Sequence, residues 1–502
     1  MNQNLNRLAC LLFSIGLAAC GGGGSGATPS GTNLSSNGGS NGTNTIGGTP
    51  SAISYTVSGT VMGLTVGQYV TLNENGADPT TVSAPNTAFK FSAGITENSP
   101  YAVTIDTNSL FTTCSVSANG AASQLKANVN NVGINCAPYV ESVLYSYGHI
   151  TNDAELASGN VIQGSDNNLY GLAIAGGQHS DGVLYQTTPD GTQTILHSFG
   201  SNASDGTFPN GRLIEYESNF YGVTYGGGVN GLGTVFRYSP SASAGSNYQV
   251  IYSFVGGSNG SNPRVGLTLG DDGNLYGVTT AGGKGNGVFF RIVPTTGVET
   301  GLYSFGTNSS QDVSDIEAEL VLAANSTFYG VSTGGGGHGQ GAVFAVAEGG
   351  AESILWNFTG GVDGGAPNAA LVPGPNGFYG TTTSGGNGSN FGTLFKLTLN
   401  GNGSASISPI YNFPEHETAT GPFILGTDGN LYGVVGEALP GQGALYKITP
   451  DGQEYTLYSF GTNAGDLYGP VGIIRGSNGF LYGVCETGGA NGMGGIFKYS
   501  AN

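Results

Sequence analysis

The stretch DDGNLYGVTTAGGKGNGVFFRI, residues 271–292, contains a motif that occurs seven times in the 502-residue chain. Its Tyr-Gly pair recurs at intervals of 50 to 55 residues. The tyrosines of these pairs are Tyr170, Tyr221, Tyr276, Tyr329, Tyr379, Tyr432 and Tyr482. A period of this length in strand-forming sequence is typical of propellers and solenoids. The motif therefore predicts an all-β fold built from seven copies of one unit.

Each repeat contains three further apolar segments in step with the Tyr-Gly pair. In the repeat quoted above, GLTLG (266–270) precedes the pair, GVFF (287–290) follows it, and LYSF (302–305) comes last. Four short strands per repeat match the blade of a β-propeller. Large aromatic rings at one position of every repeat suit packing between neighbouring blades, and the Gly after each Tyr suits close backbone approach.

The phase of the repeats distinguishes a ring from an open rod. The first segment present is VLYSYG (143–148), which is a fourth strand with no blade before it. The last is GIFKYS (495–500), which is a third strand with nothing after it. We expect residues 143–147 to pair with residues 496–499 and to close a ring of seven four-stranded blades over residues 139–502. A solenoid would instead need polar caps at both ends.

Residues 51–138 predict a separate small β domain. Short alternating segments such as YTVSGTV and YAVTIDTN are divided by Gly, Asn and Pro, which is typical of a β-sandwich. This segment loosely resembles the immunoglobulin-like and prealbumin-like modules of bacterial envelope proteins, and we interpret it as a spacer. Cys114 and Cys136 are the natural disulfide pair in an oxidising compartment, while Cys485 is expected to be a small buried residue.

The N-terminus predicts export. Arg7 precedes an apolar run that is too short to span a bilayer and has the length of a signal peptide. It ends in Leu-Ala-Ala-Cys at Cys20, which resembles the lipobox of bacterial lipoproteins. The resemblance implies a signal peptide over residues 1–19, lipid on Cys20 and, from Gly21, sorting to the outer membrane, on its periplasmic or its outer face. Residues 20–50 are rich in Gly, Ser and Asn, which indicates a flexible tether.

Charge and composition exclude several classes of partner. The formal net charge is −19, and nucleic acids are bound mainly through Lys and Arg, so we expect no nucleic-acid partner. The chain has five His, none of them at a paired spacing typical of zinc sites. We therefore expect no metal and no cofactor.

Taken together, the recurring residues GNLYG, GG, VF and LYSF resemble the GloVer (Gloeo/Verruco) tandem repeat of bacterial exported proteins, which occur with varied membrane or surface anchors. The resemblance covers residues 141–502. It implies an exported repeat protein. It supplies no catalytic residue to carry over.

Candidate binding residues lie in loops where the repeats differ. Asp205, Asp363 and Asp466 each stand four residues before a proline. The sixth repeat contains Glu415, His416 and Glu417 in this region, where a solvated loop is the simpler interpretation. The aspartates could contact a ligand, but we favour loop ordering through hydrogen bonds to the backbone over Ca²⁺ binding.

Three functions fit these features. The one we favour is a lipid-anchored, non-enzymatic envelope protein whose propeller binds a glycan or an envelope protein. An alternative is an extracellular polysaccharide hydrolase or lyase with its site at the propeller channel, which carboxylates at one channel mouth would favour. A second alternative is a structural subunit of a surface assembly. No catalytic residues can be assigned from the sequence.

Overall fold

The computed structural model describes residues 52–108, 112–243, 245–306, 312–323, 325–388, 390–400, 403–436 and 443–501. The expected signal peptide, Cys20 and the tether lie outside these residues, as do residues 437–442 of the sixth repeat. The described part is all-β, and its one helical element is a 3-10 turn, η1 (Gly257–Asn259). Within this part no helix is long and apolar enough to cross a membrane.

The small domain has two main sheets around one core. The strands are β1 (Ser54–Tyr55), β2 (Val57–Met62), β3 (Tyr69–Glu74), β4 (Ala77–Ser83), β5 (Ala88–Lys90), β6 (Ile95–Thr96), β7 (Tyr101–Asn108), β8 (Thr112–Ala118), β9 (Ala121–Ala122) and β10 (Val129–Ser146). One sheet has the order β4-β3-β7-β9, and the other joins β10, β2 and β5, with β8 on β10. Side chains of both sheets, such as Val61 and Leu72, share a single buried cluster, as expected of a sandwich.

The predicted disulfide is confirmed. Cys114 on β8 and Cys136 on β10 are direct partners in the antiparallel ladder, and their sulfur atoms are bonded. The bridge therefore joins two strands that are already paired. Cys485 is fully buried, as expected of a small packing residue.

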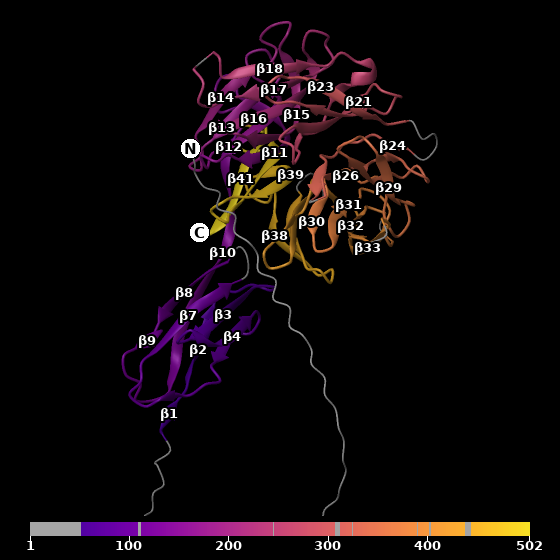
Figure 1. The fold of residues 1–502 in the computed structure, drawn as a ribbon. Helices are drawn as coiled ribbons and strands as arrows, with labels where there is room; N and C mark the ends of the chain where they lie inside the picture. Colours follow the sequence, from indigo (N-terminus) through magenta and orange to yellow (C-terminus); the bar gives the residue numbers. More distant parts are fainter. Residues whose placement is uncertain are drawn as a thin grey trace, which may run out of the picture. The chain divides into compact units, whose positions relative to one another are not determined.

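The repeats form seven sheets within the described residues, which we number repeat sheets 1 to 7 (Figure 1). Sheet 1 contains β11 (Ala154–Gln163), β12 (Leu169–Gly176), β13 (Val183–Thr187) and β14 (Gln193–Ser198). Sheet 2 contains β15 (Gly206–Tyr216), β16 (Asn219–Gly227), β17 (Thr234–Tyr238) and β18 (Tyr248–Ser253). Sheet 3 contains β19 (Ser261–Pro263), β20 (Thr268–Leu269), β21 (Leu275–Ala281), β22 (Val288–Ile292) and β23 (Glu299–Ser304).

Sheets 4 to 7 follow the same antiparallel order. Sheet 4 contains β25 (Val321–Ala323), β26 (Thr327–Ser332), β28 (Ala342–Ala347) and β29 (Glu352–Asn357), beside the short pair β24 (Val313–Ser314) and β27 (Gly334–Gly335). Sheet 5 contains β30 (Val372–Gly374), β31 (Gly377–Thr381), β32 (Thr393–Leu399) and β33 (Ala405–Asn412). Sheet 6 contains β34 (Thr418–Ala419), β35 (Ile424–Leu425), β36 (Leu431–Gly436), β37 (Ala444–Ile448) and β38 (Glu454–Ser459). Sheet 7 contains β39 (Leu467–Arg475), β40 (Leu481–Gly488), β41 (Gly495–Ala501) and the second half of β10.

The Tyr-Gly pair has a distinct packing role for each residue. The tyrosines Tyr170, Tyr276 and Tyr329 lie against an aromatic ring of the next sheet, as where Tyr170 stacks on Phe220 with ring centroids 3.9 Å apart. The glycine lies under an aromatic ring of its own sheet. A Cβ on Gly222 would lie 2.5 Å from Phe236, its partner on the adjacent strand. The predicted close approach is therefore made by an aromatic side chain, and any larger residue would displace it.

The pairing expected between the ends of the repeat region is present. Val143 of β10 pairs with Phe497 of β41, and Tyr145 pairs with Ile496. Strand β10 runs through the domain boundary predicted at residue 138, because its first half pairs with β2 and β8 and its second half with β41. Buried clusters join each repeat sheet to the next, and one cluster joins sheet 7 to sheet 1 through residues such as Tyr482 and Tyr185.

Candidate functional site

The first strands of the seven repeat sheets line one hollow of about 720 Å³. In each sheet one residue of this strand is the ladder partner of the Tyr-Gly tyrosine. We call these partners the aliphatic belt: Ile162, Ile214, Thr268, Val321, Val372, Ile424 and Ile474. All of them are half-buried, and all except Ile162 line the hollow. The neighbour of Ile214 on its strand, Leu213, is buried in the sheets instead, because successive side chains of a strand point to opposite faces.

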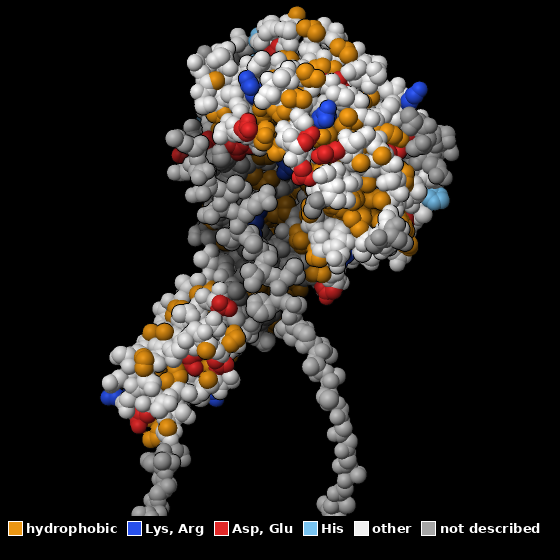
Figure 2. Space-filling view, viewed as in Figure 1, with side chains coloured by type: hydrophobic (Ala, Val, Ile, Leu, Met, Phe, Trp, Pro, Cys, Tyr) orange, Lys and Arg blue, Asp and Glu red, His pale blue; other side chains and the backbone are white. Residues whose placement is uncertain are grey.

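Toward the starts of these strands the lining changes from aliphatic to polar. Four residues before the belt position stand Asn210, Arg264, Glu317, Asn368 and Thr420. Figure 2 shows acidic and basic side chains at the edge of a hollow in which hydrophobic side chains are visible. The Oδ1 atom of Asn368 is buried and has no hydrogen-bond partner among the described residues.

Two ion pairs occupy the same end. Arg264 contacts Glu317 at 3.0 Å, and Arg212 contacts Glu319 at 3.2 Å. Arg212 belongs to sheet 2 and Glu319 to sheet 4, and Gly266 of sheet 3 lies between them. A side chain on Gly266 would block the contact, because its Cβ would lie 2.4 Å from the Glu319 carboxylate. Both arginines are about half exposed. Exposed pairs of this kind contribute about 0–1 kcal/mol to stability, so stability alone does not account for them.

Just before these polar residues the backbone enters the left-handed region. Positive φ angles occur at equivalent positions of five sheets: Leu156, Phe208, Asn262, Asp315 and Ala366. The backbone N–H of Phe208 donates to the carbonyl of Asp181, and that of Asn262 donates to the carbonyl of Leu232. The conformation thus ties the first strand of a sheet to a loop of the preceding sheet.

Phe208 is an unexpected residue for this conformation. Asn and Asp adopt left-handed angles readily, whereas a bulky side chain there is an outlier. The Phe208 ring is nevertheless 48% exposed, and Tyr225, opposite it on the adjacent strand, is 40% exposed. Asn262 of sheet 3 donates a side-chain hydrogen bond to the Tyr225 carbonyl at 3.1 Å. We call the set Phe208, Tyr225, Asn262, Arg264, Glu317 and Asn368 the rim.

The loop aspartates singled out from the sequence lie elsewhere, buried in their own loops. Asp205, Asp363 and Asp466 are 3%, 8% and 8% exposed. The hydrogen bonds expected for loop ordering are present: Asp205 accepts from the backbone N–H of Ser201, Asp363 from that of Thr359, and Asp466 from that of Thr462. Each also accepts from an aromatic or imidazole side chain of the preceding strand, namely His197, Trp356 and Tyr458.

Glu415, His416 and Glu417 do not converge on one point. Glu415 and His416 are largely exposed, with 3.7 Å between carboxylate and ring. Glu417 accepts a hydrogen bond from Tyr446 at 2.6 Å, and burial raises the pKa of its carboxyl. Among the described residues no group of three or more His, Cys, Asp or Glu side chains is arranged to hold a metal ion.

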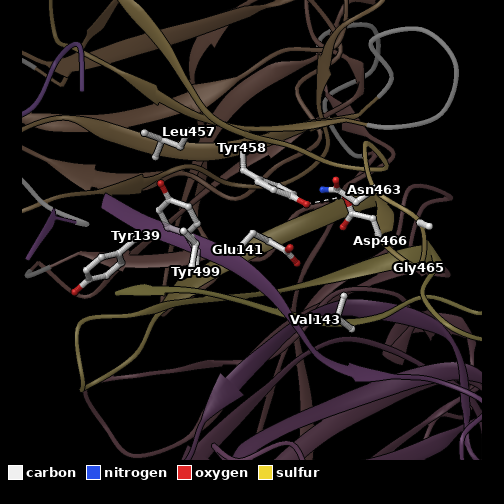
Figure 3. Close-up of a pocket in the computed structure, with 11 residues that line it drawn as sticks. Tyr139, Glu141, Val143, Leu457, Tyr458, Asn463, Gly465, Asp466 and Tyr499 are labelled. Atoms are coloured by element: carbon white, nitrogen blue, oxygen red, sulfur yellow. Dashed lines mark hydrogen bonds between the residues drawn. The ribbon is translucent and has the colours of Figure 1, made fainter. Parts of the chain in front are cut away.

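A second pocket, of about 350 Å³, contains two carboxyl groups between the outer strands of sheets 6 and 7 (Figure 3). Tyr458 donates to Asp466 at 2.7 Å, and Glu141 of β10 lies beside them with its Oε1 atom buried and unpaired. Burial and the negative charge of Asp466 raise the pKa of Glu141 to about 7. The arrangement recurs, because Tyr252 donates to Glu299 of the next sheet and Tyr303 donates to Glu352. We therefore interpret it as a contact between sheets.

Replacing Glu141 should change how stability depends on pH. The folded pKa of about 7 lies above the ordinary value of 4.5, so protonation stabilises the fold fully below pH 4.5. That contribution is lost as the pH rises through 7. After allowance for solvent screening we expect the wild type to be less stable than Glu141→Gln by about 1–2 kcal/mol at pH 8 and equal to it at pH 4.5. Urea unfolding at both pH values measures this.

The matched control for this prediction is Glu155→Gln, which changes an exposed carboxyl on β11. It should follow the wild type at both pH values. If the Glu141→Gln variant also has the unfolding free energy of the wild type at both pH values, the surroundings of Glu141 do not hold its carboxyl protonated.

Comparison with solved structures returns β-rich proteins of low sequence identity. An oligogalacturonate lyase from Vibrio parahaemolyticus has a TM-score of 0.45 at 12% identity, over 72% of this chain and 97% of that one. PorZ, a surface component of the type-IX secretion system of Porphyromonas gingivalis, has a TM-score of 0.44 at 13% identity, over 84% of this chain and 54% of that one. A protein of unknown function from Bacteroides thetaiotaomicron has a TM-score of 0.39 at 14% identity, over 87% and 90% of the two chains.

No curated protein matches the sequence. A family of repeats does: its profile, the Gloeobacter/Verrucomicrobia repeat, matches residues 104–344 and 307–497. The match begins inside the small domain, earlier than the repeat region defined by the Tyr-Gly motif, and otherwise agrees with the resemblance found in the sequence. Because the two matches together extend from residue 104 to residue 497 of the 502, the chain belongs to the Gloeobacter/Verrucomicrobia repeat family.

Proposed function

We propose that this protein is exported, is anchored to the cell envelope by lipid on Cys20, and acts as a non-enzymatic binding module that takes a glycan at the rim of a closed seven-bladed propeller. The lipobox-like sequence ending at Cys20 supports the anchor. The pairing of β10 with β41 and the buried cluster between sheets 7 and 1 support closure of the ring. The hollow would then be the central channel.

The observation that carries the glycan proposal is the exposed ring of Phe208, which faces Tyr225 and stands two residues before Asn210, a residue that lines the hollow. Pyranose rings present C–H groups on their faces and hydroxyls at their edges. Phe208 and Tyr225 offer exposed aromatic faces on sheet 2. The neighbouring sheets offer Arg264 and Glu317 as a donor and an acceptor. Sheet 2 has an exposed aromatic ring, Phe208, at the position where sheet 3 has Asn262, and this choice of residue supports a contact between the ring and a ligand.

The hydrolase or lyase alternative has less support. Carboxylates do lie at this mouth, but Glu317 and Glu319 each bond to an arginine. Each carboxylate is therefore already bonded to a guanidinium, whereas a general acid must be free to give its proton to the substrate. The structural alternative predicts self-association at low concentration, which the experiment below also detects.

The test compares the full chain carrying Cys20→Ala, which needs no detergent, with the same chain also carrying Phe208→Asn. Retention on immobilised glycans and on envelope fractions is measured together with release of soluble products and oligomeric state. We expect retention without products, and at least tenfold weaker retention for Phe208→Asn. The same substitution should raise stability by about 0.5–1 kcal/mol, because Asn relieves the strain.

Val229→Asn is the matched control, because Val229 is another exposed apolar residue of sheet 2, at 69% exposure. It should leave retention unchanged. If the Phe208→Asn variant and the control are retained equally, the glycan does not bind at the rim. Soluble products would instead favour the enzyme.

A further inference from the structure

The interior of the hollow differs in chemistry from its rim. Below the polar residues, the lining consists of branched aliphatic side chains from six sheets, including Ile214, Val321, Val372 and Ile474. Cavities of roughly 300–1,000 Å³ with mostly apolar walls and a few polar groups are typical of small-molecule sites. At about 720 Å³ the hollow has this size, and the belt residues other than Thr268 have no polar side-chain atom that a sugar hydroxyl could bond.

One charge in this lining is uncompensated. Five charged residues line the hollow: Arg212, Arg264, Arg475, Glu317 and Glu319. Two of the three arginines bond to the two glutamates, which leaves a net charge of +1 at Arg475. Arg475 is exposed, and the described residues provide neither an ion pair nor a hydrogen bond to its guanidinium. In a chain of net charge −19, an arginine left unpaired on a concave wall is a specific feature.

Arg475 stands next to the belt and away from the rim. It is the last residue of β39 and follows directly on Ile474, a belt residue. Arg264 and Glu317, by contrast, lie four residues before the belt position of their strands. The backbone of Arg475 therefore lies at the opposite end of the belt from the residues of the ion pairs. A ligand that uses Arg475 need not contact Phe208 or Tyr225.

We propose that the hollow binds a small amphipathic anion, whose hydrocarbon body lies against the aliphatic belt and whose carboxylate is bound by Arg475. The belt stabilises the body by removing apolar surface from water. Arginine suits the head group, because its planar fork of N–H donors matches a carboxylate bidentately. A cationic head group would face net positive charge, and a neutral one would leave Arg475 without a partner. This inference goes beyond the proposed glycan site and does not depend on it.

The test uses decanoate, with decanol and decyltrimethylammonium as neutral and cationic molecules of the same chain length. Calorimetric titration is done on the full chain carrying Cys20→Ala, alone and with Arg475→Gln or Val372→Asp. We expect decanoate to bind more tightly than either comparison molecule. Arg475→Gln should weaken decanoate binding at least tenfold and leave decanol binding unchanged. Val372→Asp should weaken both, because it places a carboxylate in the belt.

Arg237→Gln is the control, because Arg237 bonds to Gln249 away from the hollow. Thermal unfolding of each variant shows whether it is folded. If the Val372→Asp variant is unfolded, Val372→Asn is used as the milder change in the belt. Absence of decanoate binding, equal binding by Arg475→Gln, or tighter binding of decyltrimethylammonium would each overturn the proposal. Glycan retention by Arg475→Gln is measured in parallel and should equal that of the parent chain, so that the two sites are tested separately.

Discussion

Deletion of residues 495–502, which removes strand β41, is expected to abolish cooperative folding of the repeat domain. This strand is the third of repeat sheet 7 and lies between β40 and β10. Ile496 and Phe497 are fully buried and Tyr499 is 3% exposed. Loss of one such side chain costs about 2–5 kcal/mol, so loss of all three matches or exceeds the typical domain stability of about 5–15 kcal/mol. Circular dichroism in the near ultraviolet during urea unfolding measures the transition.

Because β41 has a neighbour on both sides, this deletion is more damaging than the loss of an edge strand. Without β41, the second half of β10 has no partner, and the cluster that joins sheet 7 to sheet 1 loses Ile496. Lys498→Ser is the control, because it changes a half-buried side chain of the same strand without removing the ladder. It should cost less than about 1 kcal/mol. A deleted chain that still unfolds cooperatively at the wild-type midpoint would mean that the repeats hold together without this pairing.

The repeat made most of this architecture predictable. Comparison of seven copies of one motif shows which segments of each repeat are strands. The order of the segments at the two ends of the repeat region predicts the pairing of residue 143 with β41. The partners of the tyrosines were not identified, although alternation in segments such as GRLIEY contains the signal: Leu213 faces the sheets and Ile214 faces the hollow. A single strand does not show on which side the hollow lies, so the sequence cannot distinguish the two faces.

The rim could not be predicted, because tertiary hydrogen bonds override the local rules. A residue before proline is normally extended, yet Phe208, Asn262 and Ala366 each precede a proline and adopt positive φ angles. Their backbone N–H groups are fixed by loops of the preceding sheet. The contact between Arg212 and Glu319 joins residues 107 apart and depends on the glycine between them. No spacing in the sequence indicates either feature.

Asp205→Ala is expected to cost about 3–5 kcal/mol of unfolding free energy, which is large for one small side chain. The carboxylate accepts hydrogen bonds from His197 at 3.0 Å and Tyr248 at 2.9 Å, and from Ser201 and the backbone of Gly206. His197 belongs to sheet 1 and Tyr248 to sheet 2, so Asp205 joins the outer strands of two sheets as well as ordering its own loop. Removal of the carboxylate leaves these buried donors unpaired.

The pH dependence of the same residue separates the carboxylate from simple packing. Burial alone would raise the pKa of Asp205, but the hydrogen bond and charge of His197 and the bonds from Ser201 lower it to about 2. A lowered pKa gives stability that is present above the ordinary value of 3.8 and is lost as the pH falls through 2. Between pH 5 and pH 2 the wild type should therefore approach Asp205→Ala in stability.

Asp190→Ala is the control, because it changes an exposed aspartate of the sheet 1 turn, and it should cost less than about 1 kcal/mol. Urea unfolding of the three proteins at pH 7, 5 and 2 measures these differences. The difference in unfolding free energy between the wild type and Asp205→Ala could instead stay constant over this pH range. The loss of stability would then come from packing, and the hydrogen-bonded carboxylate would not be what joins sheets 1 and 2.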